Sequence, residues 1–174
     1  MSKLKVKRII MTIITIVLAF TLQCTVIKSI ALANISPNIL IVVTAVISLM
    51  HGQIEGAVTG FFTGLLVDIQ FGDILGLYAL IYLITGYVCG IFTKDYTKDN
   101  IKLPMLVITI AEFAYGVLIC ILMFILRSEF HFIYYLINNI IPELVYTIVA
   151  AVPIYIIMLY IDQKMEIAEK RSAS

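Results

Sequence analysis

The feature that most constrains this chain is a series of apolar runs separated by short polar or charged segments. The longer runs approach or exceed the roughly 20 residues that a helix needs to cross the hydrocarbon core of a bilayer. Hydrophobic residues make up 62% of the 174 residues and charged residues 13%, whereas soluble domains average roughly half apolar and a quarter charged. The sequence therefore predicts an all-α integral membrane protein, with residues 1–174 as a single polytopic membrane domain.

The apolar runs predict about six transmembrane helices, two of them short. The second and third runs would each rise only about 21 Å, at 1.5 Å per residue, and a bilayer core is roughly 30 Å thick. These two helices are therefore expected to tilt within the bundle or to extend into the polar segments beside them. The predicted spans are Ile9–Ile27, Pro37–Met50, Gly56–Ile69, Ile74–Phe92, Leu103–Leu126 and Pro142–Ile161.

The basic residues predict the orientation of the chain. Six spans with a cytoplasmic N-terminus place ten of the twelve basic residues in the cytoplasm and leave only Lys28 and Arg127 outside. Such an excess of cytoplasmic Lys and Arg is the usual signature of membrane topology. Removing one span would put either the Lys94–Lys102 loop or the C-terminal tail on the wrong side. We therefore expect both termini in the cytoplasm, and the first span is interpreted as a retained helix rather than a cleaved signal peptide.

Glycines recur every four residues through the second and third spans. This glycine row consists of Gly52, Gly56, Gly60 and Gly64, and Asp68 takes the next place in the same step. Residues four apart share a helix face, and glycine there allows another backbone to approach closely. The row is interpreted mainly as a helix-packing surface within the bundle, with Gly86 and Gly90 of the fourth span as a candidate partner. Recognition of another membrane protein remains the alternative.

The residues that follow this row resemble the core motif of the MreD family. The segment 60–69 matches a glycine-rich run that ends in Gly-Leu-Leu-x-Asp, and it is followed by Gly72, by Leu75-Gly76-Leu77 with Ala79, and by Gly86-Tyr87. Pro37 and the last span, with Pro142 and Pro153, are also similar to that family. The expected length and span count agree with it along nearly the whole chain.

The resemblance implies a non-catalytic subunit of the bacterial cell-elongation complex in the plasma membrane. It implies binding to the single-span protein MreC and work with RodA, its partner transpeptidase and MreB filaments in lateral peptidoglycan synthesis. It implies no cofactor, and it leaves open a homodimer and contacts with membrane lipid. The family is also similar in fold to the substrate-binding subunits of energy-coupling-factor vitamin transporters, which supply the alternative function. A net charge of +1 gives no bias toward nucleic acid.

Two polar positions, Asp68 and Glu112, are candidates for more than packing. Asp68, with Gly72 and Gly76 in the motif turn, is expected either to cap the next helix and brace the turn or to contact a partner. Glu112 lies well inside the fifth span, where a carboxyl group is costly unless it is bonded. A hydrogen-bonded bundle residue is the simpler interpretation, and a proton-coupled carrier that uses Glu112 and Asp68 is the alternative.

The other polar residues point to no reaction. His51 and Glu55 lie four apart and can bond across one helical turn, although they are interpreted as solvated boundary residues. Together with the distant His131 they supply too few ligands for a metal site, so no metal is expected. Known catalytic motifs do not occur in the sequence.

Overall fold

The structure is a computed structural model that describes residues 3–27, 36–72, 74–98, 100–127 and 136–173. Nearly all of these residues are helical, and none of them forms a strand. The elements are α1 (Lys3–Leu22), a π-helical turn η1 (Gln23–Ile27), α3 (Ile39–His51), α4 (Gln53–Phe71), α5 (Leu77–Cys89), a 3-10 turn η2 (Gly90–Lys94), α6 (Lys102–Arg127), a π-helical turn η3 (Leu136–Ile140) and α8 (Ile141–Ala173).

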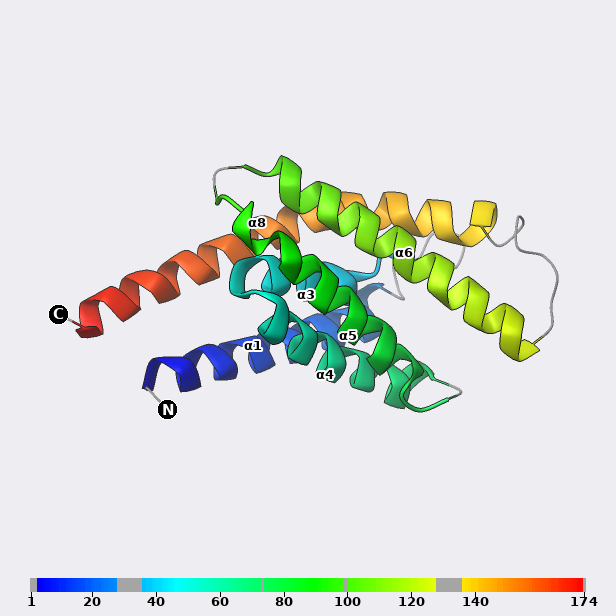
Figure 1. Cartoon of the computed structure of the whole chain (residues 1–174), viewed down its shortest axis with the longest axis horizontal. Helices are drawn as coiled ribbons and strands as arrows, with labels where there is room; N and C mark the ends of the chain where they lie inside the picture. The colour runs from blue at the N-terminus through cyan, green and yellow to red at the C-terminus, as the bar shows by residue number, and fades with distance from the viewer. Residues whose placement is uncertain (1–2, 28–35, 73, 99, 128–135, 174) are drawn as a thin grey trace.

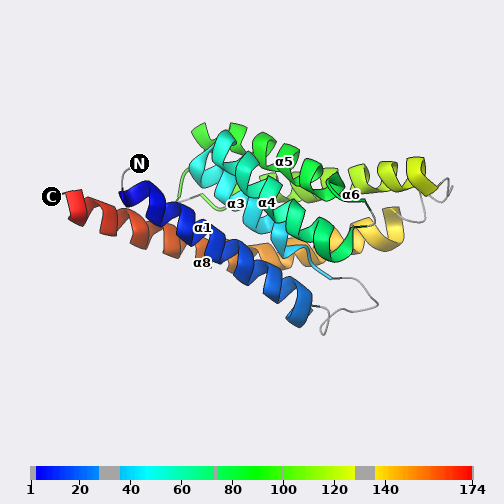
Figure 2. The same ribbon diagram turned by 90° about the horizontal axis from the view of Figure 1, so that it is seen from below.

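The helices run back and forth along one axis and form a single bundle (Figure 1). Both chain ends lie at the same end of this bundle, which we name the terminal end (Figure 2). Five helical segments are long and apolar enough to cross a membrane, and α3 is a shorter apolar helix. The predicted fold class, an all-α membrane protein with about six helices, is confirmed.

Two of the predicted spans differ in length from the helices. The second run stays short as α3, whereas the third extends to the 19 residues of α4, because the helix continues through the polar residues Gln53, Glu55 and Gln70 beside the apolar run. Such an extension was one of the two alternatives expected for the short runs. The α-helical part of the fourth span, α5, also has only 13 residues. The last helix extends to Ala173 rather than to residue 161. No glycine or proline occurs between residues 162 and 173, so nothing in that polar segment ends the helix.

The short helix α3 forms the centre of the bundle. Ile41, Val42, Ala45, Val46 and Leu49 are fully buried, and α3 contacts α1, α4, α5, α6 and α8. A helix enclosed in this way faces protein rather than lipid, so it need not span the whole hydrocarbon core. This enclosure explains how 13 residues suffice for one pass of the chain.

The chain reverses between α3 and α4 at Gly52. Its φ of 98° and ψ of 178° belong to a backbone region that is essentially restricted to glycine. Gly52 therefore ends α3 instead of lying within a helix. A Cβ there would meet no atom within 4 Å, so it is the backbone conformation of the turn that requires glycine. The regular four-residue step of the sequence gave no sign that its first glycine served a turn.

Candidate functional site

The closest helix pair in the molecule is α4 and α5, and three glycines of the glycine row make this approach possible. A Cβ atom on Gly56, Gly60 or Gly64 would come within 3.0 Å of backbone atoms of α5. For Gly64, the clashing atom would be the carbonyl oxygen of Tyr78 at 2.5 Å. Backbone atoms cannot give way as the end of a flexible side chain can, so these three positions require glycine.

Gly86 of α5 and Gly90, the first residue of η2, complete the same contact. A Cβ on Gly86 would meet the backbone of Gly56, and a Cβ on Gly90 would meet the backbone of Gln53 at 2.5 Å. The two helices therefore present small residues to one another along most of their length. This geometry assigns Gly56, Gly60 and Gly64 to packing within the chain, which leaves no room on this face for a helix of another protein.

Asp68 caps α5 from the neighbouring helix. Helix α5 begins after Gly76, which adopts a left-handed φ of 101° and has no side chain that could accept a hydrogen bond. Instead, the two carboxylate oxygens of Asp68 accept hydrogen bonds from the backbone N–H groups of Tyr78 and Ala79, each at 2.9 Å. These are the donors that an N-cap side chain normally satisfies. The buried carboxylate also lies at the positive end of the helix dipole.

The turn between α4 and α5 depends on the two other glycines of the motif. Gly72 ends α4 and donates its N–H to the carbonyl oxygen of Asp68 at 2.9 Å, and a Cβ there would meet the backbone of Asp68 at 2.7 Å. The positive φ at position 76 is a conformation that glycine adopts without strain, so this turn requires Gly76. Asp68, Gly72 and Gly76 together therefore fix where α5 begins.

A chain of buried polar groups joins α3, α5, α6 and α8. The Asn38 side chain caps α3 by accepting from the N–H of Ile41 and also accepts from the Tyr82 hydroxyl at 3.0 Å. The Asn38 N–H donates to the Thr147 hydroxyl at 2.9 Å, and this hydroxyl donates to Oε1 of Glu112 at 3.4 Å. The other Glu112 oxygen is buried and has no hydrogen-bond partner among the described residues. Among the described residues, therefore, only one of the two carboxyl oxygens of Glu112 has a hydrogen-bond partner.

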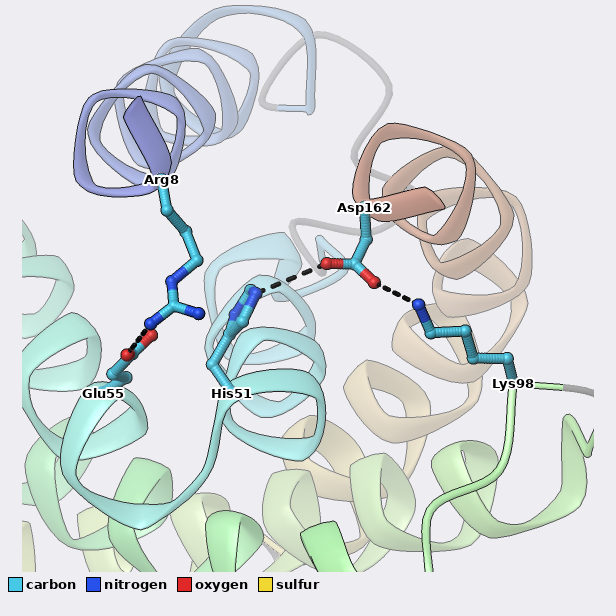
Figure 3. Close-up of polar contacts among 5 residues, drawn as sticks. All are labelled: Arg8, His51, Glu55, Lys98 and Asp162. Carbon is cyan, nitrogen blue, oxygen red and sulfur yellow. Dashed lines mark hydrogen bonds and ion pairs between the residues drawn. The ribbon is translucent and has the colours of Figure 1, made fainter. Parts of the chain in front are cut away.

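Charged side chains connect the helices at the terminal end (Figure 3). The Arg8 guanidinium of α1 pairs with Glu55 of α4. On the other side of the same end, Asp162 of α8 accepts from Lys98 at 2.9 Å and lies 3.4 Å from Nε2 of His51. The suggested bond between His51 and Glu55 does not form, because the two side chains turn to different helices.

The sequence did not predict that these charged side chains lie together. We name them the charged cluster: Arg8, His51, Glu55, Lys98 and Asp162. Arg8 and Glu55 are 47 residues apart, and Lys98 and Asp162 are 64 apart. No short motif connects them, and only the helix arrangement brings them together. A cavity of about 260 Å³ lies beside this cluster and is lined by Arg8, Met50, His51, Thr93, Tyr96, Lys98, Asp162 and Met165.

A second cavity lies at the end of the bundle opposite the termini. It has a volume of about 230 Å³ and is lined by Gln23, Ser36, Asn38, Leu40, Val67, Phe71, Tyr78, Tyr82, Tyr115 and Glu143. Tyr82 and Tyr115 pack edge to face with ring centroids 5.5 Å apart. Among the described residues, no group of three or more His, Cys, Asp or Glu side chains is placed to hold a metal ion.

The outer surface of the bundle is apolar along several helices. On α4, Ile54 is 78% exposed and Ile69 is 69% exposed, and on α8 Val149 is 68% exposed. Such large exposed apolar surfaces are those that lipid or another membrane helix covers. The arrangement therefore suits a membrane scaffold whose polar groups hold its own helices in place.

A family model described as rod shape-determining protein MreD matches residues 3–165. No curated protein and no solved structure matches the chain. The expected likeness in fold to transporter substrate-binding subunits consequently has no support among solved structures.

Proposed function

Because the chain belongs to the MreD family of rod shape-determining membrane proteins, we propose that it is the subunit of the cell-elongation complex that binds MreC and supports lateral peptidoglycan synthesis. The observation that carries the proposal is the family match over residues 3–165, which includes all six helices up to Met165 of α8. The proposed subunit is non-catalytic: it holds partners in place and leaves polymerisation and crosslinking to RodA and its transpeptidase.

The proposed surface for MreC is an exposed apolar face rather than the glycine row. A single-span partner must pack its helix against side chains that face the lipid. On α4 these include Ile54, Val58, Phe62 and Ile69, all more than half exposed. Because the opposite side of α4 packs tightly on α5, this face is rigid, and a rigid surface loses little conformational entropy on binding. We therefore place MreC on α4.

The proposed orientation puts the terminal end in the cytoplasm of a bacterial cell. The positive-inside rule supports it, since Lys3, Lys5, Lys7, Lys94 and Lys98 all belong to this end. The charged cluster and the Lys94–Lys102 loop would then face MreB filaments. Homodimerisation through a second apolar face, such as that of α8, is compatible with this arrangement.

The first test is affinity purification of the tagged full-length protein from its native membranes in a mild detergent, followed by mass spectrometry. We expect recovery of MreC together with RodA or its transpeptidase. Recovery of a paired-ATPase transporter module without any wall-synthesis protein would overturn the proposal.

A photocrosslinking scan then tests the surface. A crosslinking amino acid at Val58 or Phe62 on α4 is expected to capture MreC, whereas the same amino acid at Val149 on α8 is the matched control with similar exposure. Capture from Val149 and not from α4 would refute the assignment of the face and leave the partner itself established.

A further inference from the structure

The cavity opposite the termini has an unusual combination of lining groups. Three tyrosines, Tyr78, Tyr82 and Tyr115, line it together with the carboxyl group of Glu143. Glu143 is the only charged residue among the lining residues that the structure describes. Within the described part of the chain, no Lys, Arg or His side chain forms an ion pair with Glu143. The cavity therefore offers one carboxyl group with no cationic side chain of the described residues beside it.

A second carboxyl group is connected to the same cavity wall. Oε2 of Glu112 is buried and has no hydrogen-bond partner among the described residues. Glu112 is joined to the cavity wall through the hydroxyl of Thr147 and the backbone N–H of Asn38. Burial favours the neutral form of a carboxyl group, whereas a cation beside it favours the charged form.

Aromatic rings favour one kind of cation. The ring faces of tyrosine are electronegative, and they attract ammonium groups that have given up part of their hydration. Inorganic cations prefer several oxygen ligands in a closed shell, and no such group of ligands exists among the described residues. The volume of about 230 Å³ is also below the roughly 300 Å³ at which drug-sized ligand sites begin.

From this geometry we infer that the cavity formed by α3, α4, α5, α6 and α8 binds the ammonium group of a small organic amine, held by Glu143 and by the ring of Tyr115. Tyr82 is buried, is hydrogen-bonded to Asn38 and packs edge to face against Tyr115, so the Tyr115 ring is in position before a ligand arrives. In this arrangement Glu143 supplies the charge, and the Tyr115 ring replaces water around the ammonium group. Either an aminophospholipid headgroup or a soluble amine can supply this ammonium group.

The test uses the full-length protein in a non-ionic detergent and choline as the probe. Saturation-transfer NMR measures choline binding against that of its neutral isostere, in which carbon replaces the ammonium nitrogen. We expect choline to bind at least about tenfold more tightly, which corresponds to one charge-assisted contact. Equal binding of the two compounds would overturn the inference, since it would show a merely apolar or water-filled cavity. This comparison needs no variant.

Variants then assign the residues. Glu143→Gln is expected to weaken choline binding about tenfold or more, and Tyr115→Leu about threefold or more. Tyr115→Phe keeps the ring and should retain binding, and Glu55→Gln, at the terminal end, is the matched control for loss of one carboxylate. Choline binding by a folded Glu143→Gln protein at the wild-type level would refute the assignment.

A last measurement separates the two sources of the amine. Short-chain phosphatidylethanolamine is compared with free ethanolamine, and phosphatidylglycerol with the same acyl chains serves as the control. Tighter binding of the aminophospholipid identifies a lipid headgroup as the occupant, and tighter binding of free ethanolamine identifies a soluble amine. If phosphatidylglycerol competes with choline as well as phosphatidylethanolamine does, the ammonium group is not what the cavity recognises.

Discussion

Replacement of Gly60 by alanine tests the close packing of α4 on α5. The new methyl group would lie within 3.0 Å of the Tyr82 backbone, so the two helices must separate along their contact. Overpacking of this kind costs about 1–3 kcal/mol. Alanine also favours the helix over glycine by about 1 kcal/mol, which offsets part of that cost. We expect Gly60→Ala to lower the free energy of unfolding by up to about 2 kcal/mol.

Gly116→Ala is a matched control on α6. It makes the same chemical change within a helix, but the methyl group would meet only the side chain of Ile140, at 2.9 Å. A side chain can rotate away, so the helix preference should prevail and the stability should stay the same or rise by up to about 1 kcal/mol. The expected difference between the two variants is therefore about 2 kcal/mol, and the glycine-to-alanine preference cancels from it.

Thiol labelling provides the assay. Cys89 on α5 is only 3% exposed, and it serves as a reporter in a background in which Cys24 and Cys120 are replaced. Brief labelling of Cys89 across a series of denaturing detergent concentrations gives the free energy of unfolding for each variant. If Gly60→Ala and Gly116→Ala give the same value, the backbones of α4 and α5 are not in close contact, and the reasoning from the glycine row fails.

Three further predictions concern polar groups. Asp68→Ala leaves two backbone N–H groups without an acceptor and should destabilise the protein by about 2–4 kcal/mol. Asp68→Asn keeps one acceptor and should lower the free energy of unfolding by about half as much. Equal losses of stability in the Cys89 labelling assay would contradict the capping geometry. Replacement of Lys98 by Met and of Asp162 by Asn, singly and together, should give a coupling energy of about 0.5–1 kcal/mol that falls in high salt, and a value of zero would refute the ion pair. Glu112→Gln keeps the acceptor for the Thr147 hydroxyl and should change the free energy of unfolding by less than about 1 kcal/mol. Glu112→Ala removes the acceptor and leaves a cavity, which together cost at least about 2 kcal/mol. Similar melting temperatures for these two variants would show that the hydrogen bond is absent.

The sequence was sufficient to predict the number and type of the helices, because hydropathy depends only on which residues follow one another. It was less reliable at their ends. The polar residues after Ile161 continue α8, since helix formation requires only the absence of breakers and not apolar character. For α4, a polar residue such as Glu55 was taken as a boundary, although it lies in the first turn of the helix.

The contacts between helices could be predicted only in part. The spacing of Gly56, Gly60 and Gly64 indicated a packing face, and α5 is the helix that lies against it. In contrast, the acceptor and donors of the α5 cap are ten and eleven residues apart and lie on two different helices, so no capping motif within a single helix end indicated them. Asp162 gave no signal either, because its partners His51 and Lys98 come from two other parts of the chain.

Polar groups determine where the central helix stops, although apolar groups determine that it is buried. All the side chains from Leu40 to Leu49 are within 4% of full burial, so the core opposes a shift of α3 only through the shapes of its side chains. At one end Asn38 is bonded to Tyr82 and Thr147. At the other, His51 meets Asp162 and the backbone must turn at Gly52. A shift by one turn, about 5.4 Å, would break the contacts at both ends together. The two cavities are therefore bounded by a helix of fixed register, and a ligand or partner at either end binds a site whose shape is already formed.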